Sequence, residues 1–230
     1  HKWRHSYDVI DKIITPSAFY KKKFEEFGIP GKRVVHIPNF LDTEKPEINK
    51  TNDCEEYYLY FGRLSEEKGV LTLLRAFQGI DAKLYIVGTG PIKSDIEEYI
   101  SAESITNIKV LGFMSGQPLK DIVGNAKAVI LPSEWYENGP YSAIEALQMG
   151  RPIIGANIAG IPELVDGNGY LFKSGSPEDL KEQIEKMEGL TEAEYQKLKS
   201  NSYKLFLNSY TKENHYKKLE KIYLSVLNNH

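Results

Sequence analysis

The sequence is poor in the features that mark several classes of protein. Cys54 is its single cysteine among 230 residues, so neither an internal disulfide nor a cysteine-based metal cluster can form, which favours a reducing compartment. No stretch approaches the roughly 18 consecutive apolar residues of a membrane-spanning helix, and the opening residues HKWRHSYD lack the apolar segment of a signal peptide. We therefore expect a soluble protein that is not secreted, and we take the glycosylation-type triplet Asn49-Lys50-Thr51 as a chance match.

Charge and known motifs exclude further classes. The 29 Lys and Arg and the 32 Asp and Glu leave a formal net charge of −3, which excludes a polybasic nucleic-acid binder held mainly by phosphate contacts. The five histidines show no metal-ligand spacing, and the sequence has no Gly-x-x-x-x-Gly-Lys-Ser/Thr phosphate loop. Gly88-Thr89-Gly90-Pro91 is not a full dinucleotide fingerprint, and a tight turn explains it equally well.

What is present is an alternation of short apolar runs and amphipathic segments. Hydrophobic residues make up 41% of the chain, enough to bury a sizeable core. Strand followed by helix, repeated, predicts an α/β fold of the Rossmann-like, doubly wound parallel type, with helices on both faces of the sheet. The predicted strands are IIT near 13, RVVHI near 33, YYLYFG near 57, KLYIVG near 83, IKVLG near 108, AVILP near 128, PIIGA near 152 and GYLF near 169.

A polar stretch, DTEKPEINKTNDCEE, divides this pattern and is predicted to be a linker over residues 42–55. Residues 1–41 hold one strand-helix-strand unit, too little to bury its own faces, so we interpret them as the tail of an N-terminal domain. Residues 56–190 are predicted to form the main domain. Residues 191–230 are predicted to be helical, with an apolar stripe on the last helix that has to pack on something.

The densest cluster of candidate functional residues follows the predicted strand near 128. Ligands of open parallel sheets bind just past the carboxyl ends of strands. Glu137 falls in the loop there, and Glu145 falls inside the following helix. Gly139 allows a close backbone approach, Pro140 suits a first helical position, and the amides of Tyr141 and Ser142 would offer an anion site. Taken alone, Glu137 is more simply explained as a solvated loop acid and Glu145 as an ordinary helix acid.

A second cluster, FGRLSEEKG, follows the predicted strand near 57 and therefore reaches the same edge of the sheet. An arginine fork and a lysine point charge can hold a diphosphate that gains negative charge as a bond breaks. Arg63 and Lys68 are the candidates for that role. The alternative is a surface pair in which Glu66 or Glu67 balances Lys68.

Several motifs in order resemble the retaining GT-B glycosyltransferases of family 4. The resemblance is strong over residues 56–190, and residues 13–42 resemble the end of the family's first domain with its crossing linker. The matching stretches are GRLSEEKG (62–69), VGTGP (87–91), VLGFM (110–114), PSEWYENGPYSAIEALQMGRPIIG (132–155) with its Glu-x7-Glu spacing, and AGIPELVDGNGYLF (159–172).

The resemblance implies a role for each matching position. Arg63 and Lys68 would stabilise the leaving diphosphate, and Glu137 would hold hydroxyls of the transferred sugar. Glu145 would take the ribose hydroxyls. The remaining implied substrate-binding residues, several of which act through their backbone, are Gly62, Phe113, Met114, Asn138, Gly139, Pro140, Tyr141 and Ser142. The family needs neither a metal nor another cofactor, and its mechanism demands no protein general base.

The resemblance also implies what the chain does and what it lacks. It predicts the nucleotide-sugar-binding portion of a hexosyl- or N-acetylhexosaminyl-transferase in cell-surface polysaccharide synthesis. The acceptor, a glycan or lipid-linked sugar, would bind the N-terminal domain, which is almost wholly absent, so this chain alone is expected to bind a donor without transferring it. A cytoplasmic location follows, with membrane association residing in the absent half. Two alternatives stay open: a binding module without turnover, and another GT-B chemistry such as epimerisation or phosphorolysis.

Overall fold

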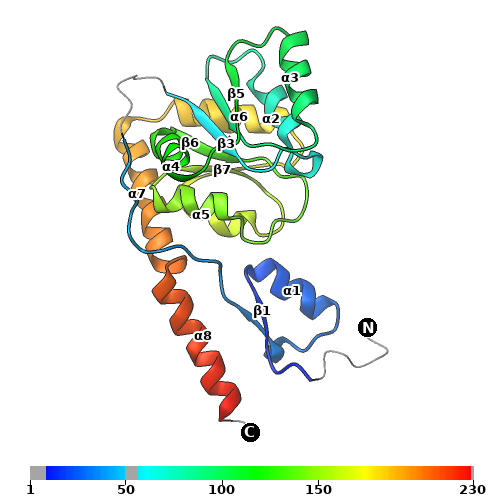
Figure 1. Ribbon diagram of the computed structural model, residues 1–230, viewed down its shortest axis with the longest axis vertical. Helices are drawn as coiled ribbons and strands as arrows, with labels where there is room; N and C mark the ends of the chain where they lie inside the picture. The colour runs from blue at the N-terminus through cyan, green and yellow to red at the C-terminus, as the bar shows by residue number, and fades with distance from the viewer. Residues whose placement is uncertain (1–8, 50–55, 229–230) are drawn as a thin grey trace.

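The protein is described by a computed structural model, whose described residues are 9–49 and 56–228. Its centre is a six-stranded sheet in which every neighbouring pair of strands is parallel, in the order β5-β4-β3-β6-β7-β8 (Figure 1). The strands are β3 (Tyr58–Phe61), β4 (Leu84–Val87), β5 (Ile108–Gly112), β6 (Ala128–Leu131), β7 (Ile153–Ala156) and β8 (Gly169–Phe172). The predicted Rossmann-like parallel fold is confirmed, and each of these strands lies in a predicted apolar run.

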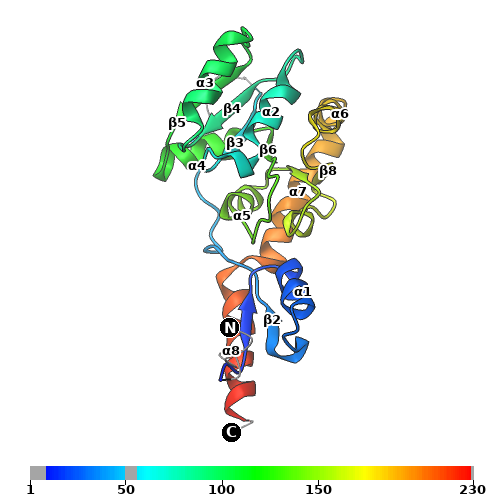
Figure 2. The same cartoon turned by 90° about the vertical axis from the view of Figure 1, so that its right-hand side faces the viewer.

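Helices cover both faces of this sheet. On one face α2 packs against α3 and α6, and on the other α5 packs against α4 and α7 (Figures 1 and 2). The helices are α2 (Val70–Phe77), α3 (Lys93–Ala102), α4 (Gly116–Asn125), α5 (Tyr141–Gln148), α6 (Pro177–Glu188) and α7 (Glu192–Ser209). Strands β3, β6 and β7 are buried along their whole length because both faces are covered, which is why they read as continuous apolar runs.

The N-terminal segment forms a separate small unit, as the sequence predicts. Strands β1 (Ile13–Thr15) and β2 (Val34–His36) make a two-stranded parallel sheet, connected by α1 (Ala18–Glu26) and a short 3-10 turn, η2 (Gly31–Arg33). We call residues 13–41, from β1 to the end of the segment after β2, the N-terminal unit. Ser17 caps α1 by accepting a hydrogen bond from the Tyr20 amide at 3.3 Å. The unit lies below the six-stranded sheet, beside the last helix (Figure 2).

The segment after this unit has no helix or strand from residue 42 to 49. Cys54, Lys50 and Thr51 lie outside the described residues. The domain boundaries proposed from the sequence stay predictions.

The C-terminal segment forms two helices with a break at Tyr210. Helix α7 begins with a capping box between Thr191 and Glu194 and buries Phe206. Helix α8 (Lys212–Leu227) extends away from the sheet (Figure 1), and none of its described residues is buried. Of the apolar stripe predicted on α8, Tyr216, Tyr223 and Leu227 are exposed, whereas Leu219, Ile222 and Val226 are half-buried. That this stripe packs on another surface stays a prediction. Within the described residues, no helix is both long and apolar enough to cross a bilayer.

Candidate functional site

The candidate site lies where the winding of the sheet reverses. Neighbouring strands β3 and β6 send their chains to opposite faces, β3 to α2 and β6 to α5, which opens a crevice beyond their carboxyl ends. The loop after β3 and the loop after β6 meet there, because the Glu134 amide donates to the Glu67 carbonyl at 2.9 Å. The two clusters of candidate residues predicted from the sequence, in the loops after β3 and β6, are therefore adjacent in the folded chain.

The loop after β3 is shaped by one hydroxyl and one glycine. The buried Tyr60 hydroxyl donates to the Arg63 carbonyl at 2.6 Å, and burial raises the pKa of Tyr60 above its ordinary value, which keeps the hydroxyl protonated as a donor. Gly69 has φ +67°, and a Cβ there would lie 2.0 Å from the Pro132 carbonyl oxygen. Only glycine permits this close approach, which brings Lys68 up to the loop after β6.

Lys68 and Glu137 form an ion pair across the two loops. Ser133, the residue after Pro132 at the end of β6, donates its hydroxyl to the same Glu137 oxygen at 2.6 Å. The side chain of Glu137 is 14% exposed and that of Lys68 is 28% exposed. The alternatives in which Glu137 is a solvated loop acid and Lys68 pairs with Glu66 or Glu67 are therefore wrong.

Ser133 and Tyr60 belong to the site but were not among the residues predicted from the sequence. Ser133 orients the Glu137 carboxylate. Its position directly after an apolar strand, four residues before Glu137, is the signal that could have found it. Tyr60 lies inside a buried strand, where the sequence pattern indicates only core.

The start of α5 presents backbone donors to the crevice. Gly139 has φ +67°. Helix α5 begins at Tyr141 with Pro140 as its N-cap, so the prediction of Pro140 as the first helical residue is wrong by one position. Within the described part of the chain, the amides of Tyr141 and Ser142 have no hydrogen-bond acceptor. Free amides at a helix N-terminus next to a lysine and an arginine favour an anionic ligand.

Glu145, one turn into α5, is half-buried. Burial raises the pKa of its carboxyl above 4.5. No hydrogen bond or ion pair satisfies this carboxylate within the described residues. A ligand with hydroxyl donors would therefore offset the cost of its burial.

Two cavities open at this edge of the sheet, and both include Gly62 and Arg63. The larger, of about 360 Å³, is mainly apolar and is within the size range of ligand pockets. It is lined by Phe61, Gly62, Arg63, Val87, Gly88, Thr89, Phe113, Met114 and Leu119. The smaller is lined by Tyr60, Phe61, Gly62, Arg63, Lys68, Leu131, Pro132, Ser133, Glu137, Pro140 and Ser142.

The structure thus brings most of the predicted site residues together. The predicted residues that line neither cavity are Asn138, Gly139, Tyr141 and Glu145. Asn138 and Gly139 instead contact the N-terminal unit, through Ser17 and Asn39. Phe113 is 72% exposed at the mouth of the larger cavity. Within the described residues, no three His, Cys, Asp or Glu side chains gather as metal ligands.

Comparison with known proteins defines the family. A model of the glycosyl transferases group 1 matches residues 42–205, and the chain belongs to this family. The lipopolysaccharide 1,2-N-acetylglucosaminetransferase of Salmonella typhimurium is 31% identical in an alignment 183 residues long, which covers 69% of this chain and 48% of that protein. An uncharacterized glycosyltransferase of Methanocaldococcus jannaschii is 28% identical over 176 residues, 76% of this chain and 48% of that protein. The chain spans about half the length of these curated relatives.

Solved structures agree in fold. A glycosyltransferase from Rickettsia africae superposes with a TM-score of 0.87 at 20% identity, covering 100% of this chain and 68% of that one. Anabaena HepE in complex with UDP superposes with a TM-score of 0.84 at 20% identity, covering 94% of this chain and 64% of that one. The chain therefore has the α/β fold found in GT-B glycosyltransferases.

Proposed function

We propose that this chain is the donor-binding half of a retaining GT-B glycosyltransferase of family 4. The observation that carries the proposal is the Lys68–Glu137 ion pair, held beside two free amides of α5 in the crevice between β3 and β6. The arrangement places positive charge, hydrogen-bond donors and a carboxylate around one small volume. A nucleotide sugar, with its diphosphate between a base and a hexose, needs these three kinds of contact.

The cationic groups hold the diphosphate. Arg63 lines both cavities, and its exposed guanidinium makes no hydrogen bond or ion pair within the described residues. Together with Lys68 and the amides of Tyr141 and Ser142 it stabilises the negative charge that grows on the leaving phosphate. Fixed positive charge supplies this stabilisation without a metal or other cofactor, and the departing phosphate takes the acceptor proton.

Two carboxylates, those of Glu137 and Glu145, form hydrogen bonds with the sugars of the donor. The second oxygen of Glu137 has no partner within the described residues, so it is available to hydroxyls of the transferred hexose or N-acetylhexosamine. Glu145 lies one turn beyond Ser142 and accepts hydrogen bonds from the ribose. The base occupies the larger cavity beside the backbone of Phe113 and Met114.

Uracil is the first base to test, because Anabaena HepE was solved with UDP and with UDP-glucose. The acceptor binds the other half of the enzyme and is a glycan or a lipid-linked sugar in cell-surface polysaccharide synthesis. The names of two relatives, the lipopolysaccharide transferase of Salmonella typhimurium and the amylovoran biosynthesis glycosyltransferase of Erwinia amylovora, support that setting. The reaction takes place in the cytoplasm, at the inner face of the membrane where the acceptor is lipid-linked.

The second candidate is a nucleotide-sugar-binding module without turnover, because the donor contacts proposed above all come from residues of this chain. Joining this chain to the N-terminal half of a relative separates the two functions. Transfer of labelled sugar with an unchanged anomeric configuration supports the enzyme, whereas binding without any transfer supports the module. Inversion of the anomeric centre contradicts a retaining mechanism, and an epimerised or phosphorolysed product indicates a different GT-B chemistry.

The direct test is calorimetric titration of this chain with UDP, GDP and ADP. We expect saturable binding of one nucleotide, and a loss of about tenfold or more in affinity for Arg63→Ala and for Glu145→Ala, because each removes a charged partner of the ligand. Arg75→Ala is the matched control, since Arg75 is exposed on α2, away from both cavities. Equal affinity in Arg63→Ala and Arg75→Ala would contradict the assigned diphosphate contact.

A further inference from the structure

The domain that contains the six-stranded sheet is hydrogen-bonded to the N-terminal unit at the start of α1. Glu163 lies on the 3-10 turn η4 (Ile161–Leu164) after β7. Its carboxylate accepts hydrogen bonds from the backbone amides of Ala18 at 2.9 Å and Phe19 at 2.8 Å. These amides belong to the first turn of α1 and have no partner inside that helix. A carboxylate more than 140 residues away along the chain therefore caps the N-terminus of α1.

The same unit also contacts the loop that carries Glu137. The Asn39 side-chain amide donates to the Gly139 carbonyl at 2.8 Å, and the Ser17 hydroxyl donates to the Asn138 side-chain carbonyl at 3.2 Å. The packing is close, since a Cβ on Gly139 would lie 3.3 Å from both the Asn39 amide nitrogen and the Pro16 carbonyl oxygen. Residues 138 and 139 thus have their polar contacts with the N-terminal unit rather than with their own domain.

We propose that Asn39 is a positioning residue for the donor loop, residues 137–142, and that the N-terminal unit thereby sets the geometry of the donor site. The inference rests on the proposed function. Asn39 fixes the carbonyl of the peptide between Gly139 and Pro140. The ring of Pro140 restricts the φ angle that follows this peptide. The orientation of the peptide therefore determines where the free amides of Tyr141 and Ser142 point.

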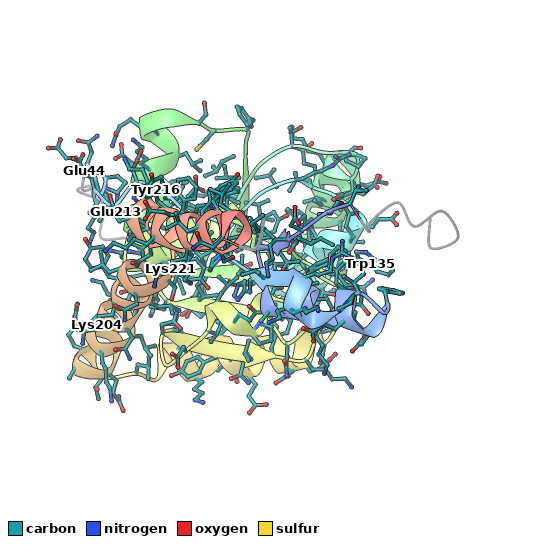
Figure 3. The ribbon with its side chains drawn as sticks, turned by 90° about the horizontal axis from the view of Figure 1, so that it is seen from below. Glu44, Trp135, Lys204, Glu213, Tyr216 and Lys221 are labelled. Carbon is teal, nitrogen blue, oxygen red and sulfur yellow. The ribbon has the colours of Figure 1, made fainter. Side chains whose placement is uncertain are left out.

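Trp135 provides a reporter in the adjoining loop. Its ring stacks on Tyr136 with centroids 5.6 Å apart, and Tyr136 in turn meets Phe19 of α1 edge-on at 4.9 Å. Trp135 is 67% exposed and, as Figure 3 shows, lies beside α1, away from Tyr216 and Lys221 of α8. The sequence has two tryptophans, so a Trp3→Phe background makes Trp135 the only source of indole fluorescence.

The test compares Asn39→Asp with Asn201→Asp in that background, using the whole chain. Asn201 makes a similar bond, from its side-chain amide to the Gly167 carbonyl at 2.7 Å, far along the chain from the donor loop. An aspartate of the same size cannot donate this bond. We expect Asn39→Asp to increase acrylamide quenching of Trp135 and to weaken UDP binding about tenfold, while Asn201→Asp changes neither. Asn39→Ala, which lacks the repulsion between carboxylate and carbonyl, should change both in the same direction by a smaller factor.

Two results would overturn the proposal: unchanged Trp135 quenching in both Asn39 variants with their fold retained, or altered quenching with unchanged affinity for UDP. If the unsubstituted chain binds no nucleotide, the proposed function fails. The ligand-free quenching comparison then still decides whether Asn39 positions the loop.

Discussion

At the scale of single residues, the site contains groups whose hydrogen-bonding capacity the protein leaves unused. Glu145 is half-buried without a partner in the described part of the chain, and Arg63 and two amides of α5 make no hydrogen bond or ion pair there. The Glu137 carboxylate, in contrast, is held by Lys68 and Ser133 on one oxygen only. Unpaired charges and donors that converge on one crevice indicate a binding site rather than a structural network.

Glu145→Gln tests this imbalance through the pH dependence of stability. Burial raises the folded-state pKa of Glu145 above 4.5, so its charge destabilises the folded chain at every pH above that raised value. We therefore expect Glu145→Gln to be more stable than the unsubstituted chain at pH 7. As pH falls through the raised pKa the folded carboxyl takes up a proton, and the difference should close near pH 4.5. Urea unfolding at both pH values measures it.

The control for this experiment is Glu185→Gln, at an exposed position on α6. Its effect on the free energy of unfolding should be small, because the side chain is exposed. A Glu145→Gln variant that is less stable than the unsubstituted chain at pH 7 would mean that the carboxylate has a stabilising partner, which contradicts the structure.

At the scale of elements, the loops after β3 and β6 are fitted to each other by backbone contact. Gly69 meets the Pro132 carbonyl, and Gly88 similarly meets Gly62, where a Cβ would lie 1.8 Å from the carbonyl oxygen. These glycines let strand ends approach more closely than any other residue allows. The positions of Arg63 and Lys68 therefore depend on the glycines that flank them.

Gly69→Ala is expected to reduce the free energy of unfolding by about 3 kcal/mol or more, because it adds a clash to a left-handed backbone angle. Gly79→Ala is the matched control: it has φ +75° and nothing within 4 Å of the added Cβ, so it should cost only about 1 kcal/mol. Urea unfolding of both variants provides the comparison. Similar losses in the two would show that the Pro132 contact is not tight.

At the scale of the whole molecule, the chain has one well-covered sheet and two appendages. The N-terminal unit is hydrogen-bonded to the domain of the six-stranded sheet through Glu163 and through residues 138 and 139, whereas α8 extends away from the sheet with no buried residue among those described (Figures 1 and 2). The contact of α8 with the N-terminal unit is near its first turn, where the His215 ring nitrogen is 2.8 Å from the Pro38 carbonyl oxygen. The outer turns of α8 therefore add little to the stability of this chain.

Tyr223→Ser and Leu227→Ser should each change the free energy of unfolding by no more than about 0.5 kcal/mol, because the two side chains are 64% and 71% exposed. Phe206→Ala, on the buried side of α7, should cost about 3–5 kcal/mol. Chemical denaturation distinguishes the two classes. A loss of several kcal/mol from Leu227→Ser would indicate that α8 packs on this chain.

The secondary-structure elements and the fold class follow from local patterns in the sequence. Strands buried on both faces must be apolar along their length, so β3, β6 and β7 could be predicted from composition alone. Ser17, Ser176 and Thr191 likewise mark the starts of helices, since a cap is a local interaction. The two loops with candidate functional residues could also be predicted, because both follow apolar strands.

Which side chains contact one another depends on how distant segments pack together. Lys68 and Glu137 are 69 residues apart, Asn39 and Gly139 are 100 apart, and Glu163 reaches α1 from still farther along the chain. The order β5-β4-β3-β6-β7-β8 makes β3 and β6 neighbours and so creates the crevice between their loops. A local pattern records which face of an element is buried, but not which distant segment covers it. For that reason neither the Lys68–Glu137 ion pair nor the hydrogen bond from Asn39 to the Gly139 carbonyl could be predicted from the sequence.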